Sequence, residues 1–144
     1  MANDHIEPIN ILLVEDNAND VLLTTKILQH AKVINNLDVV EDGEEALAYL
    51  KQEGEFAGRP QPDLILLDLN LPKKNGRELL ADIEACPELS EIPVIIQSAS
   101  DAEAELLRTT DLHANGFITK PFDLMQLIDV VNSIDVFWLS VVKK

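Results

Sequence analysis

The chain has 144 residues, of which 47% are apolar and 26% charged, proportions that fit one globular domain and exclude a wholly disordered chain. Its net charge of −15 predicts a surface that repels nucleic acids and anionic membranes, so we expect neither as a partner. The single cysteine, Cys86, excludes an internal disulfide, and no apolar run is long enough to cross a bilayer. The polar N-terminus lacks the basic and apolar regions of a secretory signal, which predicts a cytoplasmic protein.

Short runs rich in Ile, Val and Leu alternate with longer segments in which apolar residues recur every three or four positions. The short runs predict strands and the longer segments predict helices. In chain order we expect strand 10–14, helix 19–31, strand 37–40, helix 44–52, strand 63–67, helix 77–86, strand 93–96, helix 102–112, strand 116–118 and a helix from residue 123 onward. Residues typical of helix ends agree with this assignment, because Asp42 and Glu45 have the spacing of a capping box and Pro87 follows the third helix.

This alternation predicts an α/β fold, a doubly wound parallel sheet with helices on both of its faces. Three of the strand runs are almost continuously apolar, as expected for strands that are covered on both sides. No segment has the length and composition of an interdomain linker, so we expect residues 1–144 to form a single domain without an output domain. Residues 136–144 are expected to form a C-terminal apolar extension of that domain.

Polar residues follow four of the predicted strands, at the points where these strands end. They are Glu15 and Asp16 after the first strand, Asp68 and Asn70 after the third, Ser98 after the fourth and Lys120 after the fifth. Because sites in open α/β sheets form beyond the carboxyl ends of the strands, we expect these side chains to meet at one edge. Each of them alone would be interpreted as a turn or surface residue, and only their joint placement indicates a site.

The chemistry of this set favours phosphoryl transfer. Three carboxylates at one edge repel one another unless a cation lies between them, and oxygen ligands suit Mg²⁺, for which Mn²⁺ or Ca²⁺ can substitute. A lysine and a small hydroxyl residue beside the carboxylates can receive the oxygens of a phosphoryl group. The sequence contains neither a GxxxxGK[ST] loop nor a GxGxxG after a strand, so we expect no nucleotide cradle. A cation site, carboxylates and a lysine without such a loop suggest transfer of a phosphoryl group onto an aspartate carboxylate itself.

These residues make the chain resemble the receiver domains of two-component response regulators. The matching pieces are the pair Glu15–Asp16, the segment DLNLPKKNG that begins at Asp68, Ser98, Phe117 and the pair Lys120–Pro121. The resemblance covers nearly the whole chain and implies a flavodoxin-like fold with five parallel strands in the order 2-1-3-4-5. It also implies a signalling protein rather than an enzyme with an outside substrate, because a receiver catalyses only its own phosphotransfer and dephosphorylation.

The resemblance implies a role for each matched residue. Asp68 would accept a phosphoryl group from a partner sensor histidine kinase, Lys120 would pair with the phosphoryl oxygens, and Ser98 would donate its hydroxyl to the attached group. Phe117 would be the switch aromatic that turns inward as Ser98 moves, and the peptide bond before Pro121 would be cis. The implied metal ligands are Glu15 through water, the carboxylates of Asp16 and Asp68, and the backbone carbonyl of Asn70.

A finer resemblance concerns the partner and the C-terminal residues. The segments GEFAGRPQPDLILLDLNLPKKNGRELL, PELSEIPVI and SIDVFWLSVV resemble the stand-alone response regulators of phytochrome histidine kinases in cyanobacteria and other bacteria. Past Asp135 apolar residues lie all around the predicted helix, whereas a helix that covers a sheet needs one apolar stripe. Phe137, Trp138 and Leu139 either close the domain's own core or form a homodimer interface, and we expect the dimer because interfaces favour Trp and Phe.

The residues also admit other functions. A phosphorelay intermediate would use the same site, and a pseudo-receiver would keep the fold but act through protein contacts alone, against which the intact site argues. An aspartyl-phosphate hydrolase would need an acid two residues after Asp68, where the chain has Asn70. A binder of flavin mononucleotide would need a less acidic loop than the EDNAND that follows the first strand.

Overall fold

The computed structural model describes residues 9–30, 35–108, 110, 112 and 114–132, and its strands and helices alternate as the sequence predicts. Residues 133–144 lie outside the described part, so the dimer residues Phe137, Trp138 and Leu139 stay a prediction. The elements are β1 (Ile9–Val14), α1 (Ala18–Gln29), β2 (Asn35–Val40), α2 (Gly43–Leu50), the short 3-10 helix η2 (Gly54–Phe56), β3 (Leu64–Asp68), α3 (Gly76–Ala85), β4 (Val94–Ser98), α4 (Asp101–Arg108), β5 (Gly116–Thr119) and α5 (Leu124–Asn132).

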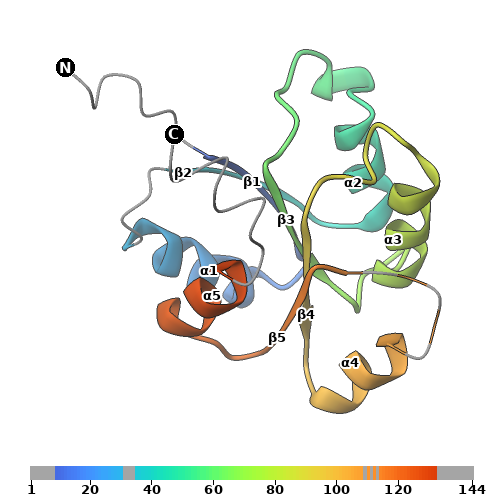
Figure 1. Cartoon of the computed structure of the whole chain (residues 1–144). Helices are drawn as coiled ribbons and strands as arrows, with labels where there is room; N and C mark the ends of the chain where they lie inside the picture. Colours follow the sequence, from blue (N-terminus) through green and yellow to red (C-terminus); the bar gives the residue numbers. More distant parts are fainter. Residues whose placement is uncertain (1–8, 31–34, 109, 111, 113, 133–144) are drawn as a thin grey trace.

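The five strands form one parallel sheet in the order β2-β1-β3-β4-β5, which confirms the predicted topology. Helices α1 and α5 cover one face of the sheet, and α2, α3 and α4 lie on the other side (Figure 1). In the register of the sheet, Leu67 of β3 pairs with Val14 of β1 and with Ile96 of β4. The carboxyl ends of the three central strands therefore lie side by side.

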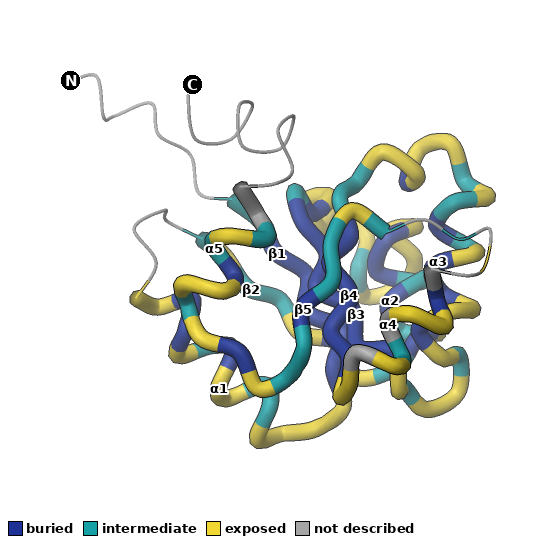
Figure 2. The backbone as a smooth tube through the Cα atoms, turned by 60° about the horizontal axis from the view of Figure 1, so that its bottom comes forward, coloured by how far each residue is buried: buried dark blue, intermediate teal, exposed yellow. Residues whose placement is uncertain are grey.

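The strands form the buried centre of the domain (Figure 2), and every residue of β3 and β4 is buried. Alternate side chains of β3 enter two different clusters. Ile65 and Leu67 pack with residues of α2 and α3, whereas Leu64 and Leu66 pack with Ile27 of α1 and other residues on that face. Full burial of each such side chain contributes about 1.5–3 kcal/mol, so the strands firmly support the residues at their carboxyl ends.

The helix starts show the expected caps with one difference. The Asp42 side chain accepts a hydrogen bond from the N–H of Glu45, as predicted, but the Glu45 carboxylate accepts from the N–H of Glu41, one residue before the cap. A complete capping box instead joins Asn75 and Glu78 at the start of α3. Both arrangements satisfy N–H groups that the first turn of a helix leaves without an intrahelical partner.

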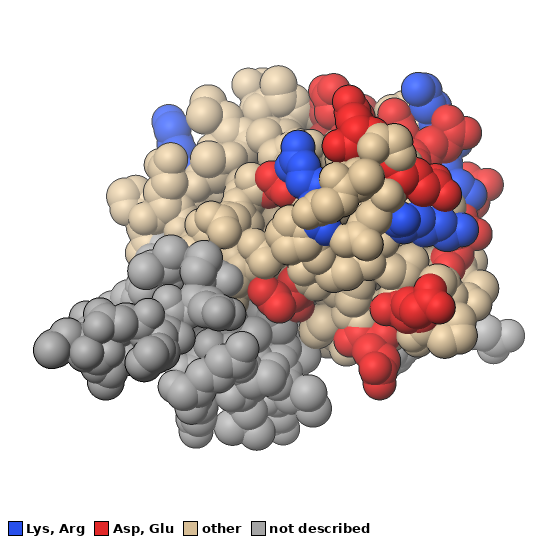
Figure 3. Space-filling model, turned by 90° about the horizontal axis from the view of Figure 1, so that it is seen from above, with Lys and Arg blue, Asp and Glu red and all other residues tan. Residues whose placement is uncertain are grey.

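None of the helices in the described residues is long and apolar enough to span a membrane. On the face that Figure 3 shows, Lys and Arg side chains stand among Asp and Glu side chains rather than in one continuous basic patch. Among the described residues, ion pairs join Lys74 with Asp82 at 2.6 Å and Arg59 with Asp38 at 3.1 Å. The absence of a nucleic-acid partner stays a prediction.

Candidate functional site

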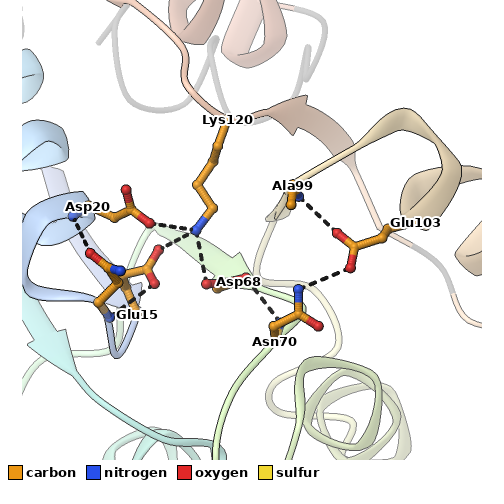
Figure 4. A network of polar contacts seen from close by, with 8 residues as sticks. Glu15, Asp20, Asp68, Asn70, Ala99, Glu103 and Lys120 are labelled. Carbon is orange, nitrogen blue, oxygen red and sulfur yellow. Dashed lines mark hydrogen bonds and ion pairs between the residues drawn. The ribbon is translucent and has the colours of Figure 1, made fainter.

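The structure brings residues from three strand ends into contact at one edge of the sheet. Lys120, which follows β5, donates hydrogen bonds from its ammonium Nζ to Oε1 of Glu15 and to Oδ2 of Asp68, each at 3.0 Å (Figure 4). The peptide bond between Lys120 and Pro121 is cis, as predicted. Residues that stand 52 and 105 positions from Lys120 in the sequence thus share one cation.

Helix α1 adds a carboxylate that the sequence analysis did not single out. Asp20 lies in the first turn of α1, and its Oδ2 accepts a third hydrogen bond from Nζ of Lys120, also at 3.0 Å. The backbone N–H of Asp20 donates to Oδ1 of the N-cap residue Asn17, which holds this turn in place. An acidic residue in a first helical turn is ordinarily explained by the helix dipole, so its type and position did not indicate this contact.

Three carboxylates provide a place for a metal ion. Glu15, Asp16 and Asp68 each offer an oxygen, and these oxygens all lie within 4.8 Å of one another. Glu15 and Asp68 are buried, whereas Asp16 is exposed. A set of hard oxygen donors with one side open to water fits the requirements of Mg²⁺.

The electrostatics of the site show why a cation suits it. Burial raises the pKa of Glu15 to about 7, and the hydrogen bond and negative charge of Asp68 contribute to this rise against the opposing effect of Lys120. Burial alone would lower the pKa of Lys120, but its hydrogen bonds to Asp20, Glu15 and Asp68 outweigh burial and hold this pKa above its ordinary value. Lys120 is therefore a permanent cation, and a second cation at the carboxylates would favour the ionised form of Glu15.

Asp68 is the last residue of β3, and its side chain is 5% exposed. While Oδ2 accepts from Lys120, Oδ1 accepts a hydrogen bond of 3.0 Å from the backbone N–H of Asn70. The loop after Asp68 folds back closely at Gly76, where a Cβ atom would lie 2.6 Å from the carbonyl oxygen of Asp68 and 2.7 Å from Cα of Leu69. Only a glycine fits at this position, so the loop that carries Asn70 is closely packed against the strand end.

The two predicted switch residues lie on the neighbouring strands. Ser98 is the buried last residue of β4, and its hydroxyl donates to the carbonyl of Ser100 at 3.0 Å. Phe117 of β5 is half-buried, pairs with Ile96 of β4 and packs against the cluster on the α2 and α3 side. In this structure the Ser98 hydroxyl thus donates to its own loop, and the switch role stays a prediction.

A groove of about 490 Å³ opens beside the site, lined among others by Asp16, Asn70, Arg77, Glu103 and Leu106. The side-chain amide of Asn70 donates to Oε2 of Glu103 at 3.0 Å. Sequence reasoning did not single out Glu103, because its type and position in α4 are those of an ordinary helix-capping residue.

Comparison with known proteins identifies the family. The response regulator receiver domain model matches residues 11–132. The chain is 42% identical over 142 residues to "Response regulator Rcp1" of Synechocystis sp., and the match covers 99% of this chain and 97% of that protein. The crystal structure of the phosphorylated cyanobacterial phytochrome response regulator RcpA is 49% identical, with a TM-score of 0.77 over 93% of this chain and 96% of that one. The Mn²⁺-bound form of response regulator Rcp1 is 43% identical, with a TM-score of 0.75 over 94% and 97%. The chain therefore belongs to the response regulator receiver domain family.

Proposed function

We propose that the protein accepts a phosphoryl group from the phosphohistidine of a partner kinase on Asp68. The observation that carries this proposal is the Asp68 carboxylate, buried at the end of β3 and held 3.0 Å from Nζ of Lys120. A carboxylate oxygen can act as a nucleophile towards phosphorus, and the neighbouring ammonium offers positive charge to the incoming phosphoryl group. Membership in the receiver family supports the same role.

In the proposed reaction an oxygen of the Asp68 carboxylate attacks the phosphorus atom. A new O–P bond forms, the P–N bond to the histidine breaks, and its electron pair stays on the imidazole nitrogen. The Lys120 ammonium, 3.0 Å from Oδ2 of Asp68, is placed to neutralise charge that develops on the phosphoryl oxygens. The product is an aspartyl phosphate.

The acidic residues beside Asp68 are the proposed holders of a divalent cation, Mg²⁺ in the cell. Glu15, Asp16 and Asp68 would hold it with their carboxylates, Glu15 through water, and Asn70 with its backbone carbonyl. Such an ion supplies positive charge that stabilises the transferring phosphoryl group. The Mn²⁺-bound form of the related Rcp1 supports the assignment.

Signalling is proposed to follow from a local rearrangement. Ser98 would transfer its hydroxyl hydrogen bond from the carbonyl of Ser100 to the phosphoryl group, and Phe117 would turn inward as Ser98 moves. Ser98 lies on β4, next to the strand of Asp68, and Phe117 lies on β5, next to β4. The movement of these two side chains would therefore change the surface around α4 and β5. The output is then a change in protein contacts.

The proposed partner is a phytochrome histidine kinase in the cytoplasm. Its support is the 49% identity to a cyanobacterial phytochrome response regulator.

The homodimer through Phe137, Trp138 and Leu139 is part of the proposal and has its own test. Deletion of residues 136–144 should lower the mass found by sedimentation equilibrium. A dimer that survives this deletion would contradict the assignment of the tail.

Phosphorylation itself is tested with acetyl phosphate and Mg²⁺, followed by intact-mass spectrometry. The wild-type protein should gain one base-labile phosphoryl group, and Asp68→Asn should gain none. Asp129→Asn, which removes an exposed carboxylate of α5, is the matched control and should label like the wild type. Equal labelling of wild type and Asp68→Asn would rule out the proposed phosphoacceptor.

A further inference from the structure

One carboxylate connects the two loops that flank the candidate site. Glu103, the third residue of α4, accepts a hydrogen bond of 2.8 Å on Oε1 from the backbone N–H of Ala99, which follows β4. Its Oε2 accepts a hydrogen bond of 3.0 Å from the side-chain amide of Asn70, which follows β3 (Figure 4). Glu103 thus joins the β3–α3 loop to the β4–α4 loop.

Helix capping explains only half of this arrangement. Ser100 and Glu103 have the capping-box spacing, and the N–H of Glu103 donates to the hydroxyl of Ser100 at 3.4 Å. The contact with Ala99 resembles the one that Glu45 makes with the N–H of Glu41 in front of α2. The bond to Asn70, 33 positions away in the chain, has no role in capping. It ties the start of α4 to the loop after the proposed phosphoacceptor.

Asn70, whose side-chain amide Glu103 engages, also contacts Asp68, at the carboxylate oxygen that Lys120 does not contact. The backbone N–H of Asn70 donates to Oδ1 of Asp68, whereas Lys120 contacts Oδ2. Figure 4 shows Asp68 between Lys120 on one side and the Asn70–Glu103 pair on the other. Asn70 and Glu103 also line the groove beside the site, so this side is open to an incoming group.

A phosphoryl group on Asp68 would disturb the contacts of Glu103 in two ways. It adds a charge of about −1.5 to −2, which repels the Glu103 carboxylate across the groove. It also brings three acceptor oxygens, for which the N–H of Ala99 and the amide of Asn70 are suitable donors. The phosphoryl group and Glu103 therefore compete for the same hydrogen-bond donors.

We propose that Glu103 is a positioning residue that clasps the two loops together in the unphosphorylated protein and releases them when Asp68 is phosphorylated. The inference rests on the proposed function, since it requires a phosphoryl group at Asp68. Release would free the first turn of α4. Leu106, which follows this turn in the chain, lines the groove and is already 57% exposed in this structure. A contact made only in the unphosphorylated state lowers the affinity for the phosphoryl group, and its removal must raise that affinity.

The first test measures the binding of beryllofluoride, a phosphoryl mimic, in saturating Mg²⁺. Glu103→Ala should bind it about tenfold more tightly than the wild type, within the usual range of coupling between two sites. Glu103→Gln, which keeps an acceptor for Ala99 but loses the charge, should bind with intermediate affinity. Glu91→Gln, which removes an exposed carboxylate from the loop before β4, should bind like the wild type. An unchanged or weakened affinity in Glu103→Ala would overturn the clasp.

The second test detects the clasp without any phosphoryl group. In ¹H–¹⁵N spectra of the protein alone, Glu103→Ala should shift the Ala99 backbone signal and the Asn70 side-chain signals, whereas Glu91→Gln should not. Unshifted Asn70 signals would overturn the clasp while leaving the proposed function intact. A third outcome separates the two proposals. If the Ala99 and Asn70 signals differ between wild type and Glu103→Ala, but the wild type does not bind beryllofluoride, the proposed function is refuted, and with it the release of the clasp.

Discussion

Replacement of Lys120 by methionine tests whether this lysine neutralises the buried carboxylates. Its contacts to Glu15 and Asp68 span 3.0 Å each, and the two carboxylate side chains are only 1% and 5% exposed. At an effective dielectric constant of about 20, each contact represents about 5.5 kcal/mol of gross attraction. The cost of removing these charges from water offsets most of this attraction. Because two buried carboxylates lose their partner, we expect Lys120→Met to lower the free energy of unfolding by about 3–5 kcal/mol in EDTA.

Urea denaturation in EDTA and in saturating Mg²⁺ measures the effect. Mg²⁺ should restore much of the stability of Lys120→Met, since a divalent cation at Glu15, Asp16 and Asp68 supplies the missing positive charge. Lys51→Met, which removes an exposed lysine at the end of α2, is the matched control and should change the free energy of unfolding little.

Two results would refute the reasoning. One is a loss below about 1 kcal/mol in EDTA, which is the size expected of a surface ion pair. The other is a stabilisation by Mg²⁺ that is no larger in Lys120→Met than in the wild type. Either result would mean that Lys120 does not act as the internal cation of the carboxylates.

Two further substitutions and one titration test the packing and the electrostatics of the domain. Gly76→Ala places a Cβ atom 2.6 Å from the backbone of Asp68, so we expect a loss of about 1–3 kcal/mol in urea denaturation and slower phosphorylation by acetyl phosphate; unchanged values would contradict the close approach. Gln97→Leu removes a fully buried amide whose nitrogen and oxygen have no partner among the described residues, and should raise the free energy of unfolding by about 1–3 kcal/mol; a decrease would show that the amide is satisfied. The only tyrosine, Tyr49, should titrate near pH 12 in ultraviolet absorbance, because burial and the hydrogen bond to Asp38 raise its pKa to about 12. Since this folded-state pKa lies above the unfolded value of about 10, the stabilising contribution of Tyr49 is complete below pH ~10 and is lost as the pH rises toward 12; a titration midpoint near 10 would contradict it.

Local patterns in the sequence were sufficient to find the strands. The runs that form β3 and β4 are continuously apolar because both of their faces are covered by helices, and their predicted ends lie within two residues of Asp68 and Ser98. Helix ends were predicted less well. The helix expected over residues 102–112 is α4, Asp101–Arg108, because the point at which a helix stops depends on packing that periodicity does not record.

The sequence by itself determined which side chains stand at the strand ends. In a parallel sheet these ends gather at one edge, so the proximity of Lys120, Glu15 and Asp68 followed from their positions in the chain, and the structure added the hydrogen bonds between them. Only the tertiary structure decided that Asp20 reaches Lys120 and that Glu103 reaches the loop after Asp68. Both residues lie in the first turn of a helix, where capping and the helix dipole already account for an acidic side chain. Their partners depend on how α1 and α4 pack against the sheet, and no spacing within the sequence encodes that.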